Sequence, residues 1–136
     1  MALSNQKQVE DFADKISECA DSIHVRLMKA IKNKEIDQYT AQLIFQDEVT
    51  LRQRANSLYI DAVNCIVDGL SQSQKSIMEL IDAAKDKIRT IKKIAGFMDF
   101  IADLLVLAAA AYAAKPAPIL AALEEVRKDL EDLNKR

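Results

Sequence analysis

Apolar residues recur every three or four positions along most of this chain, the spacing of one face of a helix. The first stripe runs from Val9 to Ile31, and Ser4 or Asn5 is placed to cap its start. We therefore predict an all-α protein, an antiparallel helical bundle of about four helices with coiled-coil-like seams in one domain over residues 1–136. The expected helices cover residues 4–33, 37–69, 71–114 and 118–134. The apolar stripes predict ten core residues: Ile16, Ile23, Leu51, Leu58, Ile81, Ile88, Leu104, Leu107, Leu123 and Leu130.

Two of the predicted connections carry strong stop signals. The segment Asn33–Asp37 is short, and Asp37 is a good cap for the next helix, so the first two helices should be antiparallel neighbours. The segment 115–118 reads Lys-Pro-Ala-Pro, and each proline removes a backbone donor. We expect turns at both places.

The middle of the chain leaves more than one interpretation open. Gly69, followed by Ser71 and Gln74, resembles a helix end and then a capping box. The apolar stripe also continues across Gly69, which would give one long helix and an elongated rod. We favour the break, with a kink at Gly96 in the helix that follows.

The segment 94–114 is apolar and about the length that spans a bilayer, yet it contains Asp99 and Asp103. Two aspartates cost about 5 to 7 kcal/mol on insertion, whereas the large apolar residues return about 4 kcal/mol, so a constitutive span is disfavoured. Their spacing of four places both carboxylates on one helical face, which suits a solvated stripe. Beyond Asp103 the segment is apolar all round, so we expect it to be buried on every face.

Composition excludes several classes of function. A net charge of −2, from 19 basic and 21 acidic residues, gives no field for nucleic acid. The N-terminal segment has no secretory signal pattern, so we expect a cytoplasmic protein, with export lacking a cleaved signal left open. Five basic residues still cluster before the apolar segment. They form either a solvated helix face or a patch that binds anionic lipid headgroups or an acidic partner. They are Lys85, Lys87, Arg89, Lys92 and Lys93.

Candidate chemistry is sparse. Asp21 and His24 have the spacing of a di-metal ligand pair, but that motif is needed twice and occurs once. Cys19 and Cys65 both fall on apolar stripes, too far apart along a helical hairpin to be joined, and are expected to be core thiols. We therefore predict a protein that is not an enzyme and has no cofactor or metal.

Two functions remain. The first is a protein–protein interaction or structural module that self-associates or binds a partner through helix seams, as an adaptor, secretion chaperone or immunity-type inhibitor. The second is a membrane-active protein with an apolar hairpin over residues 94–123, a layout that resembles helical pore-forming toxins and colicin-type hairpins. The residues that would form either surface are Phe97, Asp99, Phe100, Asp103, Leu104, Leu107, Tyr112, Pro116 and Pro118.

Overall fold

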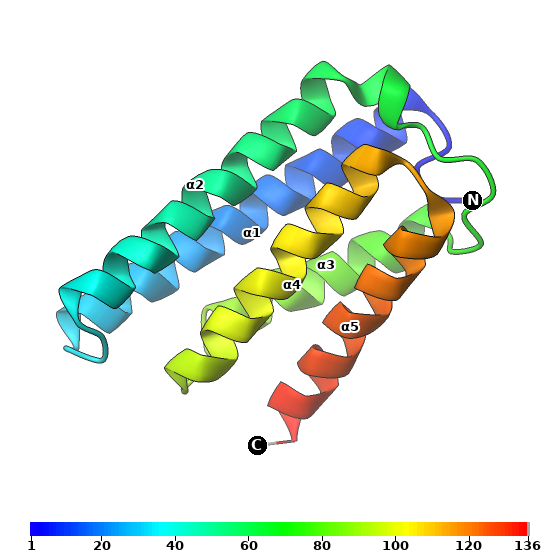
Figure 1. The fold of residues 1–136 in the computed structure, drawn as a ribbon. Coiled ribbons are helices and arrows are strands. Elements are labelled where there is room, and N and C mark those ends of the chain that lie inside the picture. Colours follow the sequence, from blue (N-terminus) through cyan, green and yellow to red (C-terminus); the bar gives the residue numbers. More distant parts are fainter. Residues whose placement is uncertain (136) are drawn as a thin grey trace.

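The computed structural model describes residues 1–135, and the elements within them are helices and turns only (Figure 1). The prediction of an all-α protein is confirmed. Residues 1–135 form five α-helices where the sequence predicted about four, and a short 3-10 helix. The elements are α1 (Gln6–Lys32), α2 (Gln38–Ile60), η1 (Ala62–Cys65), α3 (Gln74–Ile88), α4 (Ile94–Ala113) and α5 (Pro116–Asn134).

The first two helices form a hairpin, with α2 returning along α1 (Figure 1). Asn5 caps α1, since its Oδ1 accepts a hydrogen bond from the backbone N–H of Gln8 at 2.9 Å. Asp37 caps α2 in the same way, from Thr40 at 2.8 Å. The predicted turn at residues 33–37 is therefore confirmed.

The second helix ends at Ile60, so the expected boundary at residue 69 is wrong, and so is the continuous rod. The segment after η1 pairs with the N-terminal residues instead. Val67 donates its backbone N–H to the carbonyl of Leu3 at 2.8 Å, and Ala2 donates to the carbonyl of Gln72 at 2.8 Å. Long-range pairing of this kind leaves no periodic signal in the sequence.

The predicted helix over residues 71–114 is two helices, α3 and α4, joined by a turn at residues 89–93. The expected kink at Gly96 is wrong, because Gly96 lies inside the first turn of α4. The cap of α3 is Ser73 and not Ser71. Gln74 instead bonds the N-terminal segment, accepting from the backbone of Leu3 and donating to the carbonyl of Gln8.

The final helix begins two residues earlier than predicted. Pro116 occupies its first position, where a missing N–H costs nothing, and Pro118 lies in the same turn. The chain reverses at Ala114, which ends α4 in the left-handed conformation with φ of 57°. The predicted helix end at residues 115–118 is therefore confirmed to within a few residues. The chain changes direction just before the two prolines.

The helices share one hydrophobic core. In Figure 1, α4 lies between α2 and α5, with α1 and α3 behind it. Of ten residues predicted for the core, nine are buried and Leu130 is partly buried. The buried nine are Ile16, Ile23, Leu51, Leu58, Ile81, Ile88, Leu104, Leu107 and Leu123.

Candidate functional site

The inner face of α4 is part of the core. Four of the residues predicted to form a partner or membrane surface lie there with no exposed area: Phe97, Phe100, Leu104 and Leu107. Their role in the folded protein is packing.

The outward face of α4 is uncovered, which corrects the expectation that its second half is buried on every side. Fewer than half of the residues in its most apolar window are buried. Six exposed positions recur at spacings of four and three and share one side of the helix. We call them the outward face of α4: Ala95, Asp99, Ala102, Val106, Ala109 and Ala113.

A groove of about 300 Å³ borders this face, lined by Arg54, Ser57, Ala109 and Tyr112. Two contacts fix its walls. Arg54 Nη1 donates to the carbonyl of Leu105 at 2.6 Å, and the Tyr112 hydroxyl donates to Asp61 Oδ2 at 2.6 Å. The Tyr112 ring is still 46% exposed. The second half of α4 therefore presents apolar surface beside a concave edge.

The other edge of α4 carries an acidic cluster of Asp103, Glu125 and Asp129. One carboxylate oxygen from each lies within 4.8 Å of the others, across the contact between α4 and α5. The expected solvated stripe is therefore wrong for Asp103, which is half-buried, and right for Asp99, which is exposed. Burial, with the neighbouring Asp129, Glu125 and Asp99 charges, raises the pKa of Asp103 to about 8.

The acidic cluster can hold a proton, or in principle a hard cation, since carboxylate oxygens are the ligands such ions take. Asp103 Oδ2 is buried and makes no hydrogen bond to any described residue. Two members, Glu125 and Asp129, were missed in the sequence, because their distance from Asp103 depends on how α5 returns over α4. The i, i+4 spacing of Glu125 and Asp129 marks one face but does not say what that face meets.

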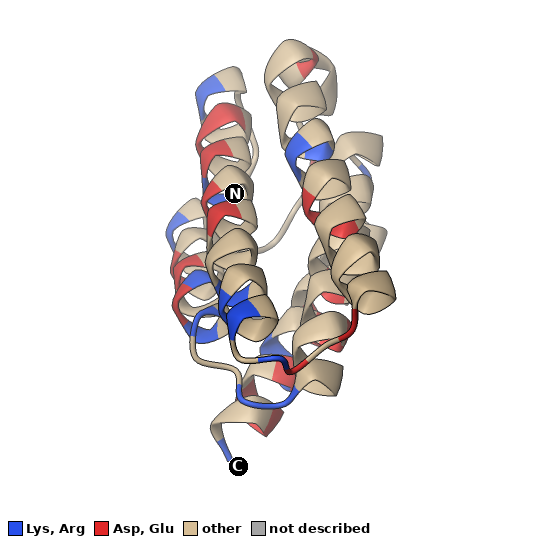
Figure 2. Cartoon of the chain, turned by 90° about the vertical axis from the view of Figure 1, so that its left-hand side faces the viewer, with Lys and Arg blue, Asp and Glu red and all other residues tan. Residues whose placement is uncertain are grey.

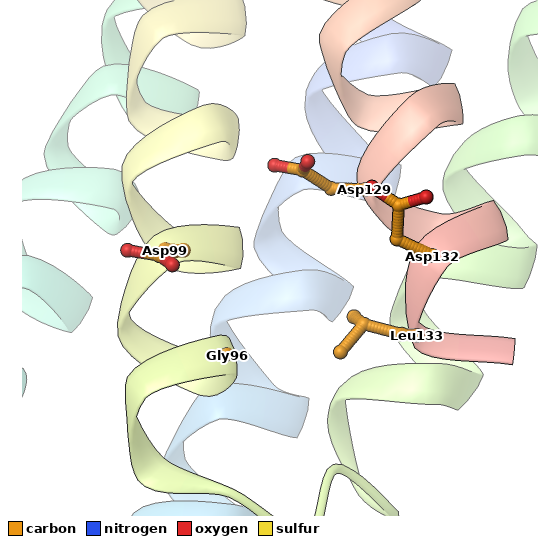
Figure 3. A pocket seen from close by; sticks show the side chains of 5 residues that line it. All are labelled: Gly96, Asp99, Asp129, Asp132 and Leu133. Carbon is orange, nitrogen blue, oxygen red and sulfur yellow. The ribbon is translucent and has the colours of Figure 1, made fainter. Parts of the chain in front are cut away.

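Near Gly96, the start of α4 lies opposite the end of α5 (Figure 3). Asp129 and Leu133 point from α5 toward α4, around a cavity of about 80 Å³ that Asp99 and Asp132 also line. A Cβ built on Gly96 would lie 3.2 Å from Leu133 Cδ2, so the glycine makes room for this side chain. Its role is close packing between helices.

The predicted basic patch divides into two groups. Lys85 and Arg89 face α1, where Lys85 Nζ lies 2.8 Å from Glu18 Oε1 and Arg89 Nε donates to Ser22 Oγ at 3.1 Å. The other three, Lys87, Lys92 and Lys93, line a cavity of about 220 Å³ with Thr90, Ile91 and Leu133. Elsewhere, basic and acidic residues are interspersed along the helices (Figure 2).

Arg26 of α1 bonds the backbone of this basic turn. The sequence did not predict this role, because Arg26 looks like a polar residue beside the apolar stripe of α1. It is 1% exposed. Its Nε donates to the carbonyl of Ile91 at 2.7 Å, and Nη2 donates to the carbonyl of Lys92 at 3.3 Å and to Glu35 Oε1 at 2.8 Å. The guanidinium also lies 5.6 Å from the centre of the Phe97 ring.

His24 and the cysteines have structural surroundings. His24 Nδ1 lies 3.0 Å from Glu48 Oε1, in a network through which Arg52 also joins Asp21, so it links α1 to α2. Cys19 and Cys65 are buried free thiols, which confirms them as core residues. Burial raises the pKa of Cys19 to about 12, so its nucleophilic thiolate is scarce at neutral pH.

Comparison of the chain with protein-family models, with curated proteins and with solved structures found no match. The packing of the core does not explain the composition of the outward face of α4 or of the cavity lined by lysines. Large apolar side chains are also exposed on α1 and α2, among them Met28, Tyr39 and Phe45.

Proposed function

We propose that this chain is a helical interaction module, not an enzyme, that self-associates through the outward face of α4. One observation carries the proposal: the most apolar helix leaves a regular face exposed, and that face has no charged residue after Asp99. Val106 at its centre is 59% exposed. Burying such a surface is favourable in proportion to its apolar area.

A second copy of the chain fits this face better than an unrelated partner. Alanines at four of its six positions let another helix approach closely, and their four-three spacing is that of a helix–helix seam. Most homodimers are two-fold symmetric, so the same face serves both copies. With two α4 helices antiparallel, Asp99 of each copy would lie near the exposed Lys115 of the other, which places opposite charges together.

Sedimentation equilibrium of the wild type and of Val106→Glu tests the proposal. Position 106 is exposed, so glutamate there should leave the fold intact. The wild type should sediment as a dimer at micromolar concentration. The variant should sediment as a monomer, because the charge would be desolvated at the centre of the seam.

Ala83→Glu is the matched control, since it makes the same kind of change at an exposed position of α3. It should remain dimeric. A wild type that is monomeric over a wide range of concentration, or a Val106→Glu variant that dimerises as well as the control, would overturn the proposal.

Membrane activity is a second candidate. The observation in its favour is that α4 is long and apolar enough to cross a bilayer, a weak indication because core helices of soluble proteins also meet this test. In this function α4 and α5 would form a hairpin that separates from α1, α2 and α3 and inserts into the membrane. The exposed Asp99 and the acidic cluster would then oppose insertion.

Vesicle flotation of the Asp99→Asn, Asp103→Asn double variant tests this second candidate. Removing both charges should increase binding to anionic vesicles, and acidification should increase binding of the wild type for the same reason. If wild type and double variant both fail to bind at neutral and acidic pH, the membrane candidate has no support.

A further inference from the structure

We infer that the cavity beneath the α3–α4 turn binds a phosphate group, as a free phosphate ion or monoester or on the headgroup of an acidic lipid. This site lies away from the outward face of α4 and does not depend on self-association. We call it the lysine cavity: Lys87, Thr90, Ile91, Lys92, Lys93 and Leu133.

Charge is the first reason. Three of the six lining residues are lysines, Lys87, Lys92 and Lys93, and no acidic residue lines the cavity. Among the described residues 1–135 none of the three lysines forms an ion pair, whereas Lys85 of the same basic segment is paired with Glu18 and Asp82. Within the basic segment 85–93, Lys85 is therefore neutralised by acidic partners near α1. The three lysines at the cavity keep their charge without such a partner among the described residues.

The backbone of the turn is the second reason. Arg26 holds the carbonyl oxygens of Ile91 and Lys92 against the interior, so the acceptors that would repel an anion are already occupied. The next residue, Lys93, precedes the first turn of α4 and makes no side-chain cap. Because Lys93 also lines the cavity, the positive end of the dipole of this twenty-residue helix lies beside it and adds to the lysine charge.

Size and lining give the class of ligand. A cavity of about 220 Å³ is smaller than the roughly 300 to 1,000 Å³ of most sites for drug-sized molecules. Ile91 and Leu133 supply an apolar floor, and Thr90 supplies a hydroxyl. Three lysines and a hydroxyl suit a phosphate group, with room for a short carbon chain against the floor.

Titration of the full chain with inorganic phosphate, followed by amide NMR at constant ionic strength, tests the inference. We expect saturable shifts that concentrate at residues 87–95. The Lys87→Gln, Lys92→Gln, Lys93→Gln variant should bind at least about tenfold more weakly. A triple variant that binds phosphate only twofold more weakly would overturn the inference. Chemical-shift changes spread evenly over all lysines would also overturn it.

A matched control separates the site from general charge. Lys29→Gln, Lys32→Gln, Lys34→Gln changes the net charge equally at the exposed end of α1, and should keep its affinity for phosphate within about twofold. If the first triple variant is not folded by circular dichroism, Lys92→Gln and Lys93→Gln are tested singly. Both positions are exposed, and each should weaken binding more than Lys32→Gln.

Flotation with vesicles distinguishes the two sources of phosphate. Phosphate binding together with retention on phosphatidic acid vesicles, but not on phosphatidylcholine vesicles, assigns a lipid headgroup. Phosphate binding without retention assigns a free ion or monoester. No saturable phosphate binding and no retention on either vesicle would overturn the inference.

Discussion

Arg26 on α1 donates a hydrogen bond to the carbonyl of Ile91, 65 residues further along the chain, and so fixes the turn that separates α3 from α4. We expect Arg26→Met, which leaves an unbranched apolar side chain without donors, to lower the free energy of unfolding by at least about 2 kcal/mol. The buried carbonyl oxygen of Ile91 and the partly buried carbonyl oxygen of Lys92 lose their donor, and loss of the partner of a buried group costs about 1 to 3 kcal/mol. Urea denaturation followed by circular dichroism measures the change.

Arg127→Met is the control for this prediction, because Arg127 pairs with Glu124, whose side chain is exposed. Its change should be within about 0.5 kcal/mol. Equal stability of the two variants would contradict the role given to Arg26.

Asp103→Asn should stabilise the protein increasingly as pH rises. The pKa of Asp103 is raised from 3.8 to about 8 in the folded state, so the folded protein keeps a proton that the unfolded chain has lost between these values. The stability contributed by that proton is complete below about pH 4 and is lost as pH rises through 8. The asparagine side chain of the variant has no proton to lose in this range of pH. The difference in free energy of unfolding between Asp103→Asn and the wild type should therefore be near zero at pH 4 and largest above pH 8.

Asp68→Asn is the control for the pH dependence, since Asp68 is exposed and its charge is not among those that raise the pKa of Asp103. The difference in stability between this variant and the wild type should depend less on pH than the difference for Asp103→Asn. Thermal unfolding from pH 4 to pH 9 provides the measurement, and a flat difference for Asp103→Asn would show that the acidic cluster does not hold a proton.

Truncation of core residues should be costly at two positions named from the sequence stripe. Leu58 and Leu104 have no exposed area, so Leu58→Ala and Leu104→Ala should each lower the free energy of unfolding by about 2 to 5 kcal/mol. Val63→Ala, at an exposed position away from α4, should cost less than about 0.5 kcal/mol. Losses below that level at both leucines would show that they are not core residues.

The sequence predicts the helices better than their ends. The stripe through Ile16 and Ile23 and the caps at Asn5 and Asp37 are local signals, and the structure bears them out. The segment after η1 pairs with Leu3, and the turn at residues 89–93 is bonded by Arg26. Both partners are distant in the chain, so no local pattern reports these contacts.

The candidate surfaces show the same division. Lys85 and Lys87 look alike in sequence, yet one is paired with Glu18 and the other lines a cavity. Likewise Asp99 and Asp103 share a helical face by spacing, but Asp103 is half-buried in the cluster with Glu125 and Asp129, whereas Asp99 is exposed. Side-chain type and period identify the members of a patch, and tertiary packing decides which of them remain free.

Oxidative cross-linking of Val106→Cys is the most direct measurement of self-association through α4. Cys19 and Cys65 are buried, and burial raises the pKa of both thiols, so the introduced thiol is the reactive one. Symmetric α4 helices that pair along the outward face bring the two copies of residue 106 within the roughly 7 Å that a disulfide spans. Mild oxidation should therefore give a covalent dimer in high yield, whereas Ala83→Cys should form no covalent dimer under the same conditions. Equal cross-linking of the two variants, or none at position 106, would contradict self-association through this face.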